Sequence, residues 1–220
     1  MRSIKFFNRI MGLNADITFR CPLECPACAR QFAFKEKGKR VHGHDITLDD
    51  IKKLARHFKS IKFCGQLSDP VHHPKFIEIL KYLYDNNVNV SVHNASSAKS
   101  KSWYIKAFKA HPKAEWIFGI DGLPEQSHLY RKNQDGLKLY DIMLEAKKYI
   151  KGKIYWQYII FNYNEDNIEK AKEMARRDGL SFFLIHSSRW LKDDPLIPSL
   201  KYRKSKRGDG APSMYVKVFG

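Results

Sequence analysis

The stretch Ala15-Asp-Ile-Thr-Phe-Arg-Cys-Pro-Leu-Glu-Cys-Pro-Ala-Cys28 places three cysteines directly after a run of residues suited to a β-strand. The cysteines are Cys21, Cys25 and Cys28, in the spacing Cys-x3-Cys-x2-Cys. Three thiolates can hold three irons of a [4Fe–4S] cluster, which normally takes four, so one iron would stay open to another ligand. Short cysteine spacings also suit tetrahedral zinc, and Cys64 or one of nine histidines could complete such a site. The motif alone leaves both a cluster and zinc open.

Length and composition place the chain among ordinary globular proteins. Its 220 residues suffice for one substantial core and suggest a single domain, and 43% of them are hydrophobic. No apolar run approaches the length of a membrane span, and the N-terminal segment 1–10 lacks the pattern of a secretory signal. Four cysteines, three of them in one motif, argue against a disulfide scaffold and for a reducing compartment. We therefore expect a soluble cytoplasmic protein.

The chain is strongly basic, with 40 lysines and arginines against 23 acidic residues and a formal charge of +17. Such a charge attracts polyanions, among which nucleic acid is the usual partner. The densest basic stretch spans 201–207, and a second spans 35–40, shortly after the cysteine motif. Charge runs of this kind usually form a solvated surface. A solvated surface and an acidic substrate or partner both remain open.

Short β-like runs alternate with amphipathic helical stretches along the chain, which predicts an α/β protein with a parallel sheet. A capping-box-like start at 47–50 and a proline at position 74 each announce a helix. Six strand–helix units fit this length better than an eight-unit barrel, which typically needs about 250 residues. The expected strands are 15–20, 61–64, 88–92, 114–120, 154–161 and 182–185, and the expected helices are 51–58, 76–84, 103–108, 137–150 and 167–178.

Polar residues collect after each predicted strand. In parallel α/β proteins, ligands bind at the carboxyl ends of the strands, because the loops there are free to carry function. Two segments also have a simpler explanation, since Ser-Asp-Pro at 68–70 and Asp-Gly at 121–122 are turn signals. The pattern as a whole predicts a ligand site at one end of the sheet.

Together, these segments resemble the motifs of the radical S-adenosylmethionine (SAM) enzymes. The cysteine spacing is similar to their cluster motif, and 65–70 is similar to their Gly-Gly-Glu-Pro segment, with Ser68 in place of a glycine. Residues 93–97 occupy the place of their Thr-Asn-Gly segment, from which Ala95 departs. The run 120–131 closely resembles the Ile-Asp-Gly and His-x-Tyr-Arg run of peptide-modifying members and of members with a twitch or SPASM domain.

The resemblance implies a fold and a division of the chain. The radical SAM core is a partial (β/α)6 TIM-like barrel with parallel strands, and we assign it to residues 1–200. Residues 201–220 would be a basic C-terminal tail or, since 214–219 alternates like a strand, a strand that caps the barrel. The auxiliary-cluster domain of SPASM and twitch members needs further cysteines. None follows Cys64, so we expect that domain to be absent.

The resemblance also implies an activity. Cys21, Cys25 and Cys28 would hold a [4Fe–4S] cluster whose open iron binds SAM. One electron from the cluster would cleave SAM to methionine and a 5′-deoxyadenosyl radical. The radical would abstract hydrogen from a peptide, nucleotide or small-metabolite substrate, and a donor such as flavodoxin or ferredoxin would reduce the cluster.

By the same resemblance, SAM is contacted from the strand ends. Asp69 would accept a hydrogen bond from the methionine ammonium group, and the planar fork of Arg189 suits a carboxylate. Ala27 stands where the family commonly has an aromatic residue against the adenine, so adenine stacking would be looser or another aromatic, such as Phe32 or Phe34, would take that place. The expected SAM-binding residues are Gly65, Ser68, Asp69, Asn94, Ser96, Asp121, Arg131, Gln157 and Arg189.

Other interpretations of the same residues remain. One is a nucleic-acid-binding module that is stabilised by zinc or a cluster and uses its basic surface on phosphates. Another is a barrel that keeps the cluster but acts only in binding. Cys64 ends a predicted strand and is a candidate hydrogen-atom donor or metal ligand, although free cysteines are more often buried for packing.

Overall fold

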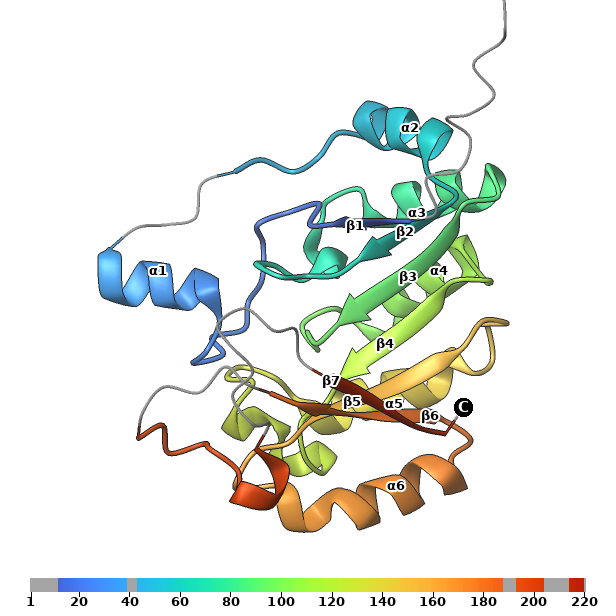
Figure 1. The fold of residues 1–220 in the computed structure, drawn as a ribbon. Coiled ribbons are helices and arrows are strands. Elements are labelled where there is room, and N and C mark those ends of the chain that lie inside the picture. The colour runs from blue at the N-terminus through green and yellow to red at the C-terminus, as the bar shows by residue number, and fades with distance from the viewer. Residues whose placement is uncertain (1–11, 39–42, 188–192, 204–213, 220) are drawn as a thin grey trace, which may run out of the picture.

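The computed structural model describes residues 12–38, 43–187, 193–203 and 214–219 of the chain (Figure 1). The strands are β1 (Leu13–Ala15), β2 (Ser60–Phe63), β3 (Asn89–Asn94), β4 (Glu115–Gly119), β5 (Ile154–Ile159), β6 (Ser181–His186) and β7 (Met214–Phe219). They form one sheet in the order β1-β2-β3-β4-β5-β6-β7. The first six run parallel to their neighbours, and β7 pairs antiparallel with β6. The α/β class with a parallel, partial-barrel sheet is thereby confirmed.

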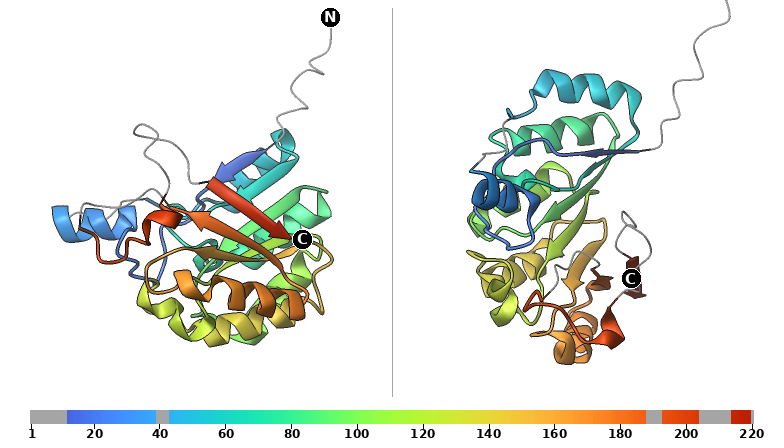
Figure 2. Two further views of the ribbon diagram at one scale, coloured as in Figure 1. Left: turned by 60° about the horizontal axis from the view of Figure 1, so that its bottom comes forward. Right: turned by 60° about the vertical axis from the view of Figure 1, so that its left-hand side comes forward.

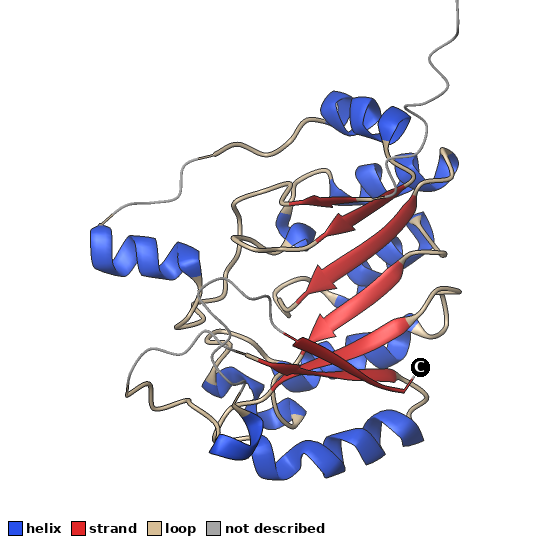
Figure 3. Ribbon diagram, in the orientation of Figure 1, coloured by secondary structure: helices blue, strands red, loops and turns tan. Residues whose placement is uncertain are grey.

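The helices connect successive parallel strands. They are α1 (Ala29–Lys37), α2 (Leu48–His57), α3 (Phe76–Asp85), α4 (Lys101–Ala110), α5 (Gly136–Ala146) and α6 (Ile168–Arg177). Short 3-10 turns lie at Pro70–His72, Pro124–Leu129, Glu165–Asn167 and Leu200–Tyr202. Helix α1 stands apart from the other helices, on the side toward which the strands point (Figure 3).

The two faces of the sheet have different surroundings, because successive strand side chains point to opposite sides. Helices α2 to α6 lie along one face (Figure 2), and the core forms there. Trp116 of β4 is fully buried and contacts Phe76 of α3 and Phe108 of α4, with ring centroids 6.4 and 4.9 Å apart. Burying a large apolar side chain contributes roughly 1.5–3 kcal/mol, so this aromatic cluster anchors the helices to the sheet.

Parallel registry brings the carboxyl ends of the strands to one edge. Phe63 of β2 pairs with Val92 of β3, and Asn94 of β3 pairs with Phe118 of β4. The loops that follow these strands therefore start side by side. A polar residue just after any of the six parallel strands reaches the same end of the barrel.

Strand β1 is shorter than the sequence predicts. The pattern at 15–20 predicts a strand there, but the strand spans Leu13–Ala15. Directly after it, the Asp16 carboxylate accepts the backbone N–H of Gln66 at 2.8 Å. A side chain has replaced a backbone carbonyl as the acceptor, so the ladder ends there.

Three other elements differ from or extend the prediction. Helix α1 was not expected, because its aromatic residues Phe32 and Phe34 are exposed and show no apolar helical face. Helix α5 ends at Ala146, four residues before the end of the predicted span 137–150, because residues 147–149 form turns. The strand expected at 214–219 does form, as β7.

Candidate active site

The loops after the strands surround a cavity of about 330 Å³. Its wall comes from the cysteine loop, from the segments after β2, β3 and β4, and from the ends of β5 and β6. The cavity thus lies at the edge where parallel α/β folds place their ligand sites. The predicted site residues that line it are Cys21, Cys25, Cys28, Gly65, Ser68, Asp69, Asn94, Arg131 and Gln157.

The three cysteines reach this cavity from one short loop. The Cys28 N–H donates to the Cys25 carbonyl at 3.0 Å, which closes a turn, and α1 starts directly after Cys28. Burial and the nearby charge of Asp69 raise the pKa of Cys21 to about 12. Burial also raises the pKa of Cys25. Thiols in such surroundings ionise when a positive centre binds them, and a coordinated metal deprotonates a thiol outright.

The donor set fits an iron–sulfur cluster. Thiolates are soft ligands that select such clusters, and each thiolate of a cubane binds a different iron. The three sulfurs of a cubane site therefore surround a volume instead of converging on one point. Within the described part of the chain, no three His, Cys, Asp or Glu side chains converge as ligands of a single metal ion. Cys21, Cys25 and Cys28 are the residues that would hold a cluster here.

The cysteine loop is tied to the segment that follows β4. The Glu24 N–H donates to the Lys132 carbonyl at 3.2 Å. The Asn133 side chain donates to the Pro22 carbonyl at 3.1 Å. These two bonds hold the first and fourth strand ends together across the mouth of the cavity.

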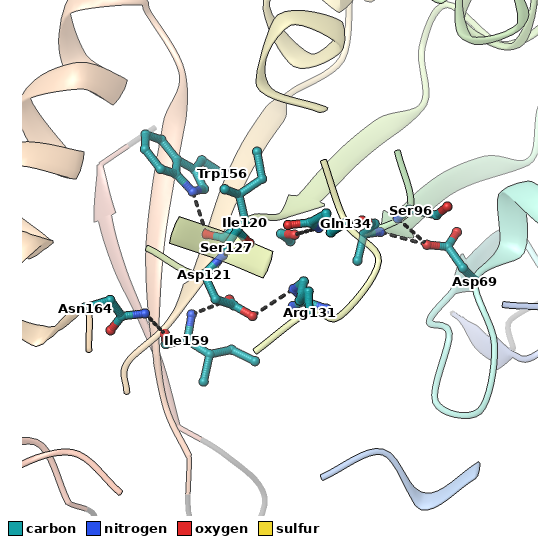
Figure 4. A network of polar contacts seen from close by, with 12 residues as sticks. Asp69, Ser96, Ile120, Asp121, Ser127, Arg131, Gln134, Trp156, Ile159 and Asn164 are labelled. Atoms are coloured by element: carbon teal, nitrogen blue, oxygen red, sulfur yellow. Dashed lines mark hydrogen bonds and ion pairs between the residues drawn. The ribbon is translucent and has the colours of Figure 1, made fainter. Parts of the chain in front are cut away.

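Asp69 links the end of β2 to the end of β3. Its Oδ2 accepts the N–H groups of Ala95 and Ser96, each at 2.8 Å (Figure 4). Its Oδ1 accepts the Val71 N–H at 3.3 Å. The side chain is almost fully buried, and this burial raises the pKa of Asp69 to about 6 although the three N–H groups favour the carboxylate. An ammonium group in the cavity would supply the positive charge that the carboxylate lacks.

Asn94 carries an unsatisfied donor. Its Oδ1 accepts the Tyr104 hydroxyl at 3.1 Å and the Ser96 N–H at 3.2 Å. Its Nδ2 is buried and has no partner among the described residues. A buried donor without a partner costs about 1–3 kcal/mol, so a ligand that accepts from Asn94 would recover this energy.

Arg131 and Asp121 form a buried ion pair beside the cysteines. Arg131 Nε lies 2.8 Å from Asp121 Oδ2, and Asp121 Oδ1 accepts the Ile159 N–H at 2.8 Å (Figure 4). Burial raises the pKa of Asp121, and the positive charge of Arg131 opposes that rise. The Arg131 charge also acts to lower the pKa of Cys25, so this cation stands next to the cysteine loop.

Of the nine residues predicted to bind SAM, eight are described by the structure, and Arg189 lies outside the described residues. Ser96 and Asp121 lie behind the cavity wall. The Ser96 hydroxyl pairs with His72 at 2.8 Å, and its N–H supports Asp69. Direct contact of Ser96 or Asp121 with SAM stays a prediction. In the structure, Ser96 hydrogen-bonds Asp69 and Asp121 pairs with Arg131, and both of these partners line the cavity.

Several residues of the wall were missed by sequence reasoning. Lys62 and His93 line the cavity from inside the strands, where alternation alone would have found them. Tyr130 and Phe161 add two rings with centroids 4.3 Å apart. The two rings offer a stacking surface where Ala27 provides no aromatic side chain. Phe32 and Phe34 of α1 are exposed and do not line the cavity.

At the level of sequence, no protein-family model and no curated protein matches this chain. Solved structures match its fold. SuiB of Streptococcus suis, bound to the precursor peptide SuiA, superposes with a TM-score of 0.63 at 11% identity, over 78% of this chain and 38% of that one. SuiB has also been solved bound to S-adenosylmethionine, with a TM-score of 0.60 at 9% identity, over 78% of this chain and 39% of that one.

Two further structures share the fold. The anSMEcpe protein with bound AdoMet gives a TM-score of 0.58 at 19% identity, over 79% of this chain and 48% of that one. Methylornithine synthase (PylB) gives a TM-score of 0.55 at 13% identity, over 79% of this chain and 52% of that one. The chain thus spans about half or less of the structures it matches. These structures, two of them with bound S-adenosylmethionine, share their fold with this chain.

None of the helices in the described ranges combines the length and apolar character that crossing a membrane requires.

Proposed function

We propose that this chain is a radical SAM enzyme that holds a [4Fe–4S] cluster on Cys21, Cys25 and Cys28. One observation carries the proposal: the cysteine loop and polar side chains from the ends of β2, β3, β4 and β5 line a single cavity. A structural zinc site would need no such polar surroundings. An enzyme that binds a charged cofactor beside its cluster would need them.

When bound at the reduced cluster, SAM supplies a 5′-deoxyadenosyl radical that abstracts hydrogen from a substrate. The protein's own task is to bind, orient and shield. Asp69 receives the methionine ammonium group, and the Asn94 Nδ2 donates to an acceptor of the cofactor. Gly65 has φ +57° and gives the backbone close access to the cavity. Holding reactants at contact distance can be worth roughly 7–11 kcal/mol, which makes this placement the main contribution of the chain.

The proposed SAM contacts keep the nine residues expected from the sequence. Gly65, Ser68, Asp69, Asn94, Arg131 and Gln157 act from the cavity wall, and Ser96 and Asp121 from behind it. Arg189 is proposed for the SAM carboxylate. A flavodoxin or ferredoxin is the proposed electron donor, and a reducing cytoplasm is the proposed compartment.

The substrate class is a separate part of the proposal. SuiB has been solved with a precursor peptide, which favours a peptide among the three candidate classes of peptide, nucleotide and small metabolite. The formal charge of +17 favours a substrate with acidic groups.

Anaerobic reconstitution with iron and sulfide tests the site. We expect a brown protein with about four irons and four sulfides per chain. The electron paramagnetic resonance signal of the reduced cluster should change when SAM is added, because SAM binds the open iron. A colourless protein that takes up one zinc ion, or a cluster signal that SAM leaves unchanged, would contradict the proposal.

A further inference from the structure

The deepest part of the cavity wall is formed by side chains that point inward from the strands. Along β2, Ile61 and Phe63 are fully buried in the core under the helices, so Lys62 and Cys64 face the opposite side and line the cavity. Lys62 precedes Cys64 by two residues and therefore lies one layer deeper in the barrel. Ser91 of β3 is its Cα partner in the sheet.

His93 of β3 faces the same side of the sheet, level with Cys64 and diagonal to Lys62, because Lys62 pairs with Ser91 and Phe63 with Val92. The Gln157 side chain hydrogen-bonds the His93 ring. Burial, assisted by the positive charge of Lys62, lowers the pKa of His93 to about 3. The ring is thus neutral at ordinary pH and has a single N–H, which is open to an anion in the tautomer where the Gln157 amide donates to the other ring nitrogen.

Lys62 has no acidic partner in the described part of the chain. The carboxylate that lines the cavity, Asp69, is held by three backbone N–H groups, and the Arg131 cation is paired with Asp121. Asp16, which lies near Cys64, accepts the Gln66 N–H. Glu115 shares the inner face of β4 but does not line the cavity.

Asn14, the Cα partner of Lys62 in β1, adds an amide to the wall, and three isoleucines add apolar surface. Ile117 of β4, Ile159 of β5 and Ile185 of β6 line the same cavity. A cation in such surroundings interacts with an anion more strongly than it would in water, because the local dielectric is lower. The inner wall thus combines one unpaired positive charge, the neutral Asn14 and His93 side chains, and apolar surface from three isoleucines.

We propose that Lys62 and His93 form a subsite for an anionic group of the substrate, a carboxylate or a phosphate, whose apolar body packs against the three isoleucines. This rests on the proposed radical SAM function, which places the cofactor at the rim and the substrate below it. Lys62 supplies the charge, and the His93 ring donates a second hydrogen bond. The substrate is therefore an organic acid or phosphate ester, or a peptide that presents an acidic side chain or its C-terminus.

The test compares anion binding by the reconstituted full chain and by Lys62→Met, which keeps the aliphatic stem and removes the charge. Inorganic phosphate and acetate are the probes, followed by ³¹P line broadening and by saturation-transfer NMR at constant ionic strength. Lys106→Met is the matched control, because Lys106 is an exposed lysine of α4 outside the cavity. Lys62→Arg keeps the charge, and Lys62→Gln is the second neutral variant if Lys62→Met melts early.

We expect at least one probe to bind the wild type and Lys62→Arg, and to bind Lys62→Met or Lys62→Gln about tenfold more weakly. The Lys106→Met titration should match the wild type. A preference for acetate would assign a carboxylate substrate, and a preference for phosphate a phosphorylated one. Equal binding by wild type and both neutral variants, or no binding by the wild type, would overturn the subsite.

SAM affinity separates this inference from the proposed function. Lys62→Met should bind SAM within about twofold of the wild type, since the subsite lies below the cofactor; a parallel loss of SAM binding would assign Lys62 to SAM and overturn the inference. If the wild type binds no SAM but its anion binding depends on Lys62, the radical SAM function fails while the anion site stands.

Discussion

Arg131 lies across the end of β4 with its Nε 2.8 Å from Asp121 Oδ2 and its guanidinium against Gly119. A Cβ added at Gly119 would come within 2.7 Å of Arg131 Nη2. Glycine at this position therefore gives the cation its place in the cavity wall. The position of Arg131 thus depends on two residues: Gly119 leaves room for its guanidinium, and Asp121 pairs with it.

Gly119→Ala should displace the Arg131 side chain from the wall. We expect SAM to bind roughly tenfold more weakly, because a charged hydrogen bond contributes about 1.5–3 kcal/mol. Isothermal titration of reconstituted protein measures the change. Gly12→Ala is the matched control, since the nearest atom to its added Cβ is the Ser60 carbonyl oxygen at 3.9 Å. Equal SAM affinity in Gly119→Ala and Gly12→Ala would contradict the role of Arg131.

Asp121→Asn should destabilise the fold. The change leaves the Arg131 cation buried without its counter-charge, which typically costs about 3–5 kcal/mol. Urea unfolding at neutral pH measures the free energy of unfolding. The double variant Asp121→Asn with Arg131→Met should recover part of the loss, because the uncompensated charge is gone. If Asp121→Asn has the same free energy of unfolding as the wild type, the ion pair does not stabilise the fold.

Asp69 predicts a pH dependence in the protein without cofactor. Its folded-state pKa of about 6 lies above the ordinary value of 3.8, so the unfolded chain loses this proton first. The contribution of Asp69 to the free energy of unfolding therefore falls as pH rises from about 4 to about 6, by about 3 kcal/mol in all. Urea unfolding of the wild type and Asp69→Asn across this range isolates the effect. A constant difference between the two proteins would contradict it.

The ionised form of Asp69 is the one that binds an ammonium group. SAM affinity should therefore rise as pH passes through about 6 in the wild type. In Asp69→Asn it should be weak at every pH, because the amide carries no charge. Titrations at pH 5 and 7 provide the comparison, and a wild-type affinity that is flat between them would remove Asp69 from the ammonium site.

Two cysteine variants test the ligand set. Cys25→Ala should lose the brown colour and the cluster signal, because two thiolates cannot hold the cluster. Cys64→Ala should keep both, since Cys64 sits at the end of β2 and outside the cysteine loop. Iron and sulfide analysis of the two variants decides the assignment. Cluster loss in Cys64→Ala, with retention in Cys25→Ala, would reverse it.

Much of the framework follows from local pattern. Strands β2 to β6 and helices α2 to α6 were predictable because alternating or helically spaced apolar residues each mark one buried face. Helix α1 was not, because Phe32 and Phe34 are exposed and their spacing signals no packing. The end of β1 was not predictable either, because it depends on the Asp16 side chain, which accepts the backbone N–H of Gln66, fifty residues further along the chain.

The same distinction holds at the site. The cysteines, Asp69 and Arg131 stand out in sequence because they follow strands in recognisable motifs. Gln134 does not, yet its side chain donates to the carbonyls of Ala95 and Gly119 at 2.5 and 2.9 Å and joins two strand ends (Figure 4). Such a tie depends on which loops the fold brings together, and no local pattern encodes that.

The cavity is proposed to bind SAM at a cluster and to cleave it. The most direct measurement is the yield of 5′-deoxyadenosine when anaerobically reconstituted wild-type protein is mixed with dithionite and SAM. We predict that the product forms with the wild type and is absent with Cys25→Ala. Protein that carries a full [4Fe–4S] cluster and yields no 5′-deoxyadenosine would contradict the proposed radical SAM activity.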